Sequence, residues 1–141
     1  MRRSPESGVY VLVIEVQAPS RIKAGALSSM DLRQGFYAYV GKAGRGLAAR
    51  LERHARSHDK RPHWHVDYLL EEAPLREIWV FSLSRGECPL AADLESAGGS
   101  REGLKGFGSS DCRCRGHLLY LGAKRPEPPR EALNVFRDLK R

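Results

Sequence analysis

The sequence lacks a long apolar run, and this absence excludes a membrane-spanning helix. No stretch approaches the ~18–20 consecutive apolar residues that a span requires. The apolar run that follows the first residues is interrupted by Glu15 and Gln17. That pattern is typical of a β-strand and not of a signal peptide.

Cysteine is also scarce. The chain has three cysteines, an odd number, and no export signal, which favours reduced thiols and a cytoplasmic location. A chain of 141 residues is long enough to form a hydrophobic core as one domain, without requiring disulfides or a metal. No internal repeat or low-complexity tract divides it.

Acidic residues are outnumbered. The sequence has 24 Lys and Arg against 17 Asp and Glu, a formal net charge of +7 and a pI near 9.7. This excess favours a polyanionic partner, with nucleic acid first.

Residues 35–54 form the stretch around which the chain is organised. A buried strand, Phe36 to Val40, is expected to stop at Gly41, and a glycine-rich turn then leads into a helix that begins near Leu47. Arg50 and His54 are four residues apart, so they share one helix face. Free backbone N–H groups beside these side chains indicate a phosphate-handling site; a strand, a turn and a solvated helix face are the alternative.

Two tripeptides extend this pattern: Gly8-Val9-Tyr10 and Tyr39-Val40-Gly41, the second followed by Arg50 and His54. Together they resemble the two signature tripeptides of the GIY-YIG nuclease superfamily. The chain looks closest to its small stand-alone, Uri-type branch, a domain family of unknown function (DUF123-like). Supporting stretches bring the resemblance to residues 8–120: HWHVDYLL at 63–70, Glu87-Cys88, and GFGSSDCRCRGHLLY at 106–120.

The resemblance implies a divalent-metal-dependent endonuclease that hydrolyses DNA phosphodiesters. By matching positions, Tyr10 is the general base or its relay, and Tyr39 lines the same pocket. Arg50 stabilises the negative charge of the phosphate, and His54 is a general acid or base. Glu87 holds Mg²⁺ or Mn²⁺. A phenol titrates near pH ~10 in isolation, so either tyrosine needs a cation, Arg50 or the metal, to lower its pKa.

Three features favour an alternative, a catalytically weak or inactive nucleic-acid-binding module on the same fold. Residues 18–34 are a longer insertion between the tripeptides than smaller members have, and Lys42 stands where relatives often carry a small hydroxyl residue. Many members place an asparagine late in the site, whereas the only asparagine here is Asn134. Glu95 also competes with Glu87 as the metal carboxylate, with Glu71 or Glu72 further behind.

Basic residues continue from the turn along the first helix, and we expect them to follow a DNA backbone without reading its sequence. They are Lys42, Arg45, Arg53, Arg56, Lys60 and Arg61. A solvated helix face is the alternative. No separate DNA-recognition domain is present in the sequence, so either DNA structure (branches, flaps, damage) or a helper protein supplies specificity; a homodimer is a further option.

Two stretches are rich in metal-ligating residues. Cys112, Cys114 and His117, with Cys88 or with His63 and His65, leave a structural zinc site open, although no C-x₂-C pair is present. The other interpretation is that the stretches pack together, with Asp67 or Asp111 holding a histidine by a hydrogen bond.

The expected fold is α/β (α+β), a mainly antiparallel central sheet of about three core strands flanked by helices, with an added C-terminal strand and helix. We divide the chain into a flexible leader (1–7), a GIY-YIG-like domain (8–121), and a linker with an amphipathic helix packed on the same domain (122–141). The expected strands are 9–16, 36–40, 77–83 and 117–121, and the expected helices 47–58, 65–72, 89–97 and 130–141. A hairpin arm anchored by Ile22 and Leu32 is expected within 18–34.

Overall fold

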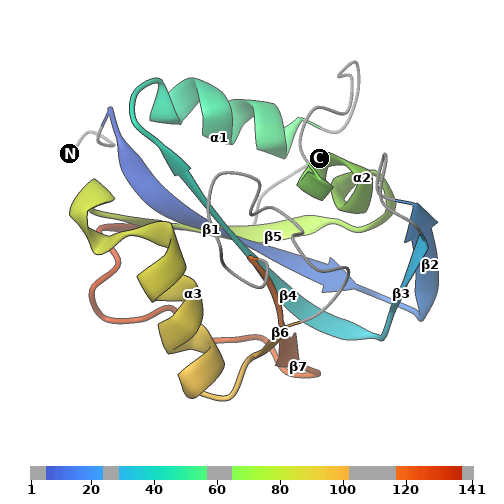
Figure 1. The fold of residues 1–141 in the computed structure, drawn as a ribbon. Helices are drawn as coiled ribbons and strands as arrows, with labels where there is room; N and C mark the ends of the chain where they lie inside the picture. Colours follow the sequence, from blue (N-terminus) through green and yellow to red (C-terminus); the bar gives the residue numbers. More distant parts are fainter. Residues whose placement is uncertain (1–5, 24–28, 57–64, 102–116, 138–141) are drawn as a thin grey trace.

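The computed structural model describes residues 6–23, 29–56, 65–101 and 117–137 (Figure 1). Its strands are β1 (Gly8–Val16), β2 (Ser20–Lys23), β3 (Ser29–Leu32), β4 (Gly35–Ala43), β5 (Leu75–Phe81), β6 (Ser100–Arg101), β7 (Leu118–Gly122) and β8 (Asn134–Phe136). Its helices are α1 (Leu47–Ala55), α2 (His65–Glu72), the short 3₁₀ helix η1 (Leu83–Arg85) and α3 (Glu87–Ser96). None of the described helices is long and apolar enough to span a membrane.

Strand β1 lies at the centre of the main sheet. Within the described residues this sheet has six strands in the order β6-β7-β4-β1-β5-β8, and every pairing is antiparallel. The predicted α+β class with a mainly antiparallel sheet is therefore confirmed, with more strands than expected. Strands β2 and β3 form a separate two-stranded arm.

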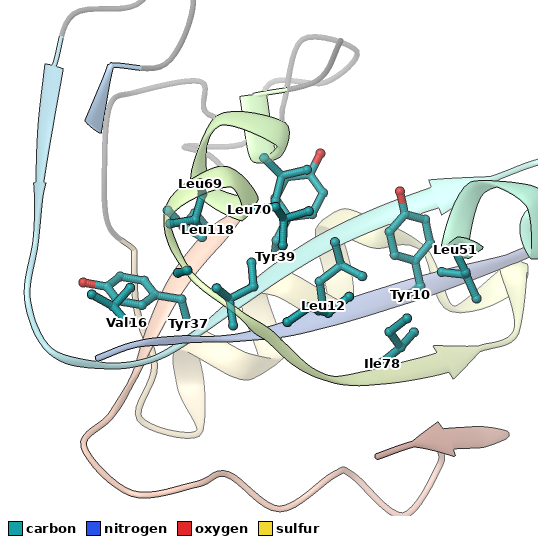
Figure 2. Close-up of a cluster of buried hydrophobic side chains, with 14 of the residues drawn as sticks. Tyr10, Leu12, Val16, Tyr37, Tyr39, Leu51, Leu69, Leu70, Ile78 and Leu118 are labelled. Carbon is teal, nitrogen blue, oxygen red and sulfur yellow. The ribbon is translucent and has the colours of Figure 1, made fainter. Parts of the chain in front are cut away.

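The two faces of β1 carry two hydrophobic cores. Tyr10, Leu12 and Ile14 pack on the side of α1 and α2, as Figure 2 shows for the first two with Leu51 and Leu69. Val9, Val11 and Val13 face the other way, with α3 residues including Leu90 and Ala91. A strand buried on both faces requires apolar residues at every position, which explains the nearly continuous apolar run. In Figure 1 the sheet accordingly lies between α3 and the pair α1 and α2.

The arm confirms the prediction for the insertion. Ile22 on β2 and Leu32 on β3 are 4% and 3% exposed and join the core on the α1 and α2 side. Figure 1 shows the arm at the end of the sheet where β1 ends and β4 begins. The insertion therefore lengthens the sheet end without separating the paired strands β1 and β4.

Strand β4 is longer than expected. It continues through Gly41 to Ala43, because Gly8 at the start of β1 pairs with Ala43. The turn before α1 is therefore confined to residues 44–46. Helix α1 ends at Ala55, and the backbone of Arg56 is extended.

The expected C-terminal helix is wrong over the described part of the segment. Residues 134–136 form β8, which pairs with β5, and the N–H of Leu133 donates to the carbonyl of Val80 at 2.7 Å. Val135 packs on the α3 side and Phe136 on the other, which is the two-residue alternation of a strand. The edge of β5 presents backbone N–H and C=O groups that a strand can pair with. Pairing with them decides the structure of this segment in spite of the helical spacing of its apolar residues. Residues 138–141 lie outside the described part.

Candidate active site

Tyr10 and Tyr39, the tyrosines of the two tripeptides, lie on adjacent strands and on the same face of the sheet. Tyr10 on β1 is opposite Gly41 on β4, and Leu12 is opposite Tyr39, so the two tyrosines are one same-face position apart on the β1–β4 ladder. Both are buried, at 2% and 5% exposure. Figure 2 shows their hydroxyl groups directed away from the strands toward the same side. The strand register therefore places the two tyrosines next to each other on one face of the sheet.

Gly41 is the position that lets the Tyr10 ring lie across β4. A Cβ atom at Gly41 would be 2.7 Å from both the Cζ and the hydroxyl oxygen of Tyr10. Such a contact is far inside van der Waals distance, and both partners are held by the sheet. The glycine of the second tripeptide is thus required for close approach of a ring, and not for an unusual backbone angle.

His54 meets Tyr10 from helix α1. Leu47, Leu51 and His54 are the buried residues of this helix, at the spacing that places them on one face. The hydroxyl oxygen of Tyr10 lies 2.9 Å from Nε2 of His54, which is fully buried. The first tripeptide on its strand and the histidine on its helix are therefore joined by one hydrogen bond.

Arg50 lies one turn before His54 and also acts on Tyr10. Its Nη1 donates to the backbone carbonyl of Lys42 at 3.0 Å, which ties α1 to the end of β4. Its guanidinium also acts on the Tyr10 hydroxyl, whose pKa it lowers by hydrogen bonding and by its charge. The structure thus brings Tyr10, Tyr39, Arg50 and His54 together.

Both tyrosines remain protonated at neutral pH. Burial raises the pKa of Tyr10; the hydrogen bond and charge of Arg50 oppose this effect but do not reverse it, and the Glu87 and Asp67 carboxylates add to it. Burial also raises the pKa of Tyr39, followed by the effects of Tyr10, Glu87 and Asp67. Arg50 therefore lowers the pKa of both tyrosines, as expected, but burial raises it by more.

Glu87 reaches the site from the opposite face of the sheet. It is the first residue of α3 and follows Gly86, whose φ of 77° makes the turn from η1. Its Oε1 lies 3.7 Å from Nζ of Lys42 and its Oε2 lies 3.6 Å from Nδ1 of His117. Its charge acts on both tyrosines.

The competing carboxylates lie elsewhere. Glu95 is two turns further along α3, and Glu71 and Glu72 are exposed at the end of α2. None of them is among the groups that shift the pKa of Tyr10 or Tyr39. Asn134 on β8 is separated from Tyr10 by β5, because both pair with Val80.

The site has the donor chemistry for one hard cation. Mg²⁺ commonly binds through one or two carboxylates and completes its shell with waters and substrate phosphates. The Glu87 side chain, 12% exposed, provides one such carboxylate, whose charge acts on both tyrosines. Among the described residues no group of three or more His, Cys, Asp or Glu side chains could enclose a metal, so the residues fit a one-carboxylate site and not a protein cage.

The predicted basic surface divides into separate parts. Lys42, Arg45 and Arg56 are exposed around the turn and the end of α1. Arg53 is different: its Nη1 lies 3.0 Å from both carboxylate oxygens of Asp67 on α2. This contact fastens α1 to α2, so we do not include Arg53 in the DNA surface. Lys60 and Arg61 lie outside the described residues.

The turn itself is not open to phosphate in the way we expected. The N–H of Gly46 donates to the Glu6 carboxylate at 2.7 Å, and the N–H of Leu47 donates to the Glu6 carbonyl at 3.0 Å. Glu6 therefore accepts hydrogen bonds from two backbone N–H groups at the start of α1, where a carboxylate is also favoured by the helix dipole. It also means that the expected flexible leader, residues 1–7, is held at its end; residues 1–5 lie outside the described part.

The sequence analysis does not identify two residues of the candidate site. Asp67 is fully buried, acts on both tyrosines and pairs with Arg53, although we considered it only as a partner for a histidine. His117 contacts Glu87, whereas the sequence suggests it only as a zinc ligand or as part of a stretch packed on residues 63–70. An acidic residue inside an apolar helix face was a usable signal for Asp67, whereas nothing in the sequence connects His117 with α3.

The zinc alternative extends beyond the described residues. Cys112, Cys114 and His63 lie outside them, as does the side chain of His65. Within them, the Cys88 Sγ is 3.5 Å from Nε2 of His117.

Comparison with known proteins gives one match. A family model, described as domain of unknown function DUF123, matches residues 9–141. No curated protein and no solved structure matches the chain.

Proposed function

The chain belongs to the family described as domain of unknown function DUF123, and from the geometry of its site we propose that it is a divalent-metal-dependent DNA endonuclease of the GIY-YIG type. The observation that carries this proposal is the 2.9 Å contact between Tyr10 and His54, with Arg50 and Glu87 acting on the same hydroxyl. A proton acceptor, a cation and a carboxylate whose charges act on one hydroxyl are the groups that phosphodiester hydrolysis uses.

Proton transfer is assigned to Tyr10 and His54 as a pair. Because burial keeps Tyr10 protonated, it cannot act as a preformed phenolate. Its hydroxyl instead donates to Nε2 of a neutral His54 in the tautomer that carries its proton on Nδ1. As water attacks phosphorus, Tyr10 accepts the water proton and passes its own to Nε2, leaving an imidazolium. The bond from phosphorus to the leaving oxygen breaks in the same step, and this oxygen takes its proton from solvent. Histidine side chains titrate in a range that allows this step near neutral pH.

Arg50 is assigned the role of stabilising the negative charge on the phosphate. A guanidinium stays charged and presents several N–H donors in one plane. The hydrogen bond to the Lys42 carbonyl orients this plane at the end of β4, next to Tyr10. Donors that are already oriented stabilise a developing charge without reorganising during the reaction.

Glu87 would hold the metal ion. A bound Mg²⁺ or Mn²⁺ would add positive charge at the phosphate oxygens. Lys42, Arg45 and Arg56 provide an exposed basic surface for the flanking DNA backbone, and contacts of this kind are sensitive to salt and not to sequence. We therefore propose that DNA shape directs cleavage.

The test is a cleavage assay with labelled linear, nicked, flapped and branched DNA, in Mg²⁺, in Mn²⁺ and in EDTA. We expect metal-dependent cleavage that Glu87→Ala abolishes. Glu95→Ala, a change of the same kind two turns along the same helix, is the matched control and should leave cleavage intact. The metal assignment is wrong if the Glu95 variant is the inactive one.

A second candidate is a nucleic-acid-binding module without useful turnover. The observation that favours it is the 3.7 Å contact between the Lys42 ammonium and the Glu87 carboxylate, because an ammonium at that place competes with a metal ion for the same oxygen. Tight DNA binding in EDTA, with no cleavage of any substrate in Mg²⁺ or Mn²⁺, would identify this function instead.

A further inference from the structure

His117 occupies a fixed position between the end of β4 and the start of α3. It immediately precedes β7, and its carbonyl accepts the N–H of Val40 at 3.0 Å. The residue is fully buried. Val40 lies between Tyr39 and Gly41, so the backbone that carries His117 is attached directly to the second signature tripeptide.

The two ring nitrogens of His117 face two consecutive residues of α3. Nδ1 lies 3.6 Å from Oε2 of Glu87, and Nε2 lies 3.5 Å from Sγ of Cys88. A neutral imidazole has one donor and one acceptor nitrogen. The tautomer with its proton on Nδ1 points a donor at the carboxylate and leaves Nε2 to accept from the thiol. In this tautomer Nε2 accepts from the thiol, and Nδ1 attracts the carboxylate across 3.6 Å, a distance just beyond that of a hydrogen bond.

Glu87 is held unequally from its two sides. Lys42 faces Oε1, but its side chain is 53% exposed and long, so its ammonium has freedom to move. His117 faces Oε2 with a side chain that is 1% exposed. The rigid neighbour of the carboxylate is therefore the histidine, and the lysine is the one that can withdraw when a cation or a DNA phosphate arrives.

We propose that His117 is a positioning residue that orients the Glu87 carboxylate for the metal ion. The inference rests on the proposed function, since Glu87 is the metal carboxylate only there. Partners that orient a ligating side chain through a hydrogen bond typically change metal affinity or activity about 10–100-fold when they are removed.

Two variants of similar size separate positioning from packing. In His117→Asn the side-chain amide nitrogen can occupy the place of Nδ1, so a donor toward Glu87 is kept. In His117→Gln the amide oxygen can occupy the place of Nε2 and accept from Cys88, so that contact is kept and the one with Glu87 is lost. Both variants lose the ring, so a purely structural role of His117 affects them alike.

The measurement is a Mn²⁺ titration of wild type and both variants, followed by electron paramagnetic resonance, with kcat and KM for DNA cleavage alongside. We expect the Asn variant to keep Mn²⁺ affinity close to wild type. The Gln variant should lose about 10–100-fold in affinity and in kcat, with KM for DNA unchanged.

Equal Mn²⁺ affinity in the two variants, whether both retain it or both lose it, overturns the positioning role. It leaves the nuclease proposal standing if the wild type still cleaves DNA. A wild-type protein that neither binds Mn²⁺ nor cleaves DNA with it overturns the nuclease proposal itself, and the positioning role with it.

Discussion

The hydroxyl of Tyr10 lies 2.9 Å from Nε2 of His54, and this bond joins the central strand of the sheet to the last turn of α1. Both side chains are buried, with 2% and 0% exposure. Buried polar groups are costly unless they are paired, so the bond stabilises the packing of α1. The same bond connects a protonated phenol to a proton acceptor, which is the basis of the proposed chemistry.

Tyr10→Phe should lower the DNA cleavage rate by about 10²–10⁴-fold, the usual effect of losing a general acid–base group. The ring still fills the core, so the fold and DNA binding should persist. Tyr37→Phe is the matched control, because the Tyr37 hydroxyl bonds the backbone of Arg33 and takes no part in the site. Cleavage at the wild-type rate by the Tyr10 variant would exclude proton transfer through Tyr10 to His54.

Gly41→Ala should displace the Tyr10 ring, since the new Cβ would lie 2.7 Å from its Cζ and hydroxyl oxygen. A catalytic group misplaced by about 1 Å commonly costs about 10²-fold in rate, and we expect a loss of that order in single-turnover cleavage. Gly44→Ala is the control: a Cβ at that position would meet nothing within 4 Å, and its rate should match wild type. Equal rates for both variants would contradict the close approach.

Stability should fall above pH ~10 because of the buried tyrosines. Burial raises the pKa of Tyr39 above its ordinary value of 10.0, so the unfolded chain releases this proton first as pH rises. The stabilising contribution is complete below pH ~10 and is lost above it, by at most roughly 1.4 kcal/mol per pH unit for each such group. Tyr39→Phe should therefore flatten the decline between pH ~10 and ~11.5 in urea unfolding; an unchanged slope would contradict the burial effect.

Glu77 should be important for stability and not for cleavage. Its Oε1 accepts from Trp79 Nε1 at 2.9 Å, and its Oε2 accepts from Arg125 Nε at 2.6 Å. Glu77→Ala leaves a buried indole N–H without its acceptor and frees the segment before β8, so we expect a loss of about 1–3 kcal/mol in the free energy of unfolding. Asp31→Ala, which breaks the exposed pair with Arg21, is the control and should have a much smaller effect, because exposed ion pairs are screened by solvent. Equal losses would contradict this assignment.

Local patterns in the sequence accounted for much of the fold. The β-branched run of β1, the position of α2 and the anchors Ile22 and Leu32 each follow from apolar periodicity, which depends only on neighbouring residues. The same holds for α1, whose buried residues Leu47, Leu51 and His54 include a candidate site histidine.

Features that depend on distant partners could not be predicted in this way. Residues 130–141 have a helical spacing of apolar residues, but residues 134–136 within them form a strand, because the edge of β5 is available to it. The pair Arg53 and Asp67 and the contact of His117 with Glu87 also depend on how separate elements pack. Sequence patterns place a side chain on a face, whereas only the tertiary fold determines what that face meets.

The measurement that tests the central claim most directly compares Arg50→Ala with Arg45→Ala in single-turnover cleavage of the preferred DNA with Mg²⁺. Both variants remove one arginine from the same region, but only Arg50 acts on Tyr10. We predict a loss of about 10²–10³-fold for Arg50→Ala, as expected for a group that stabilises transition-state charge. Arg45→Ala should weaken DNA binding and its salt dependence while leaving the rate at saturation unchanged. Full cleavage by Arg50→Ala, or equal losses in the two variants, would contradict a phosphodiester-cleaving site at this position.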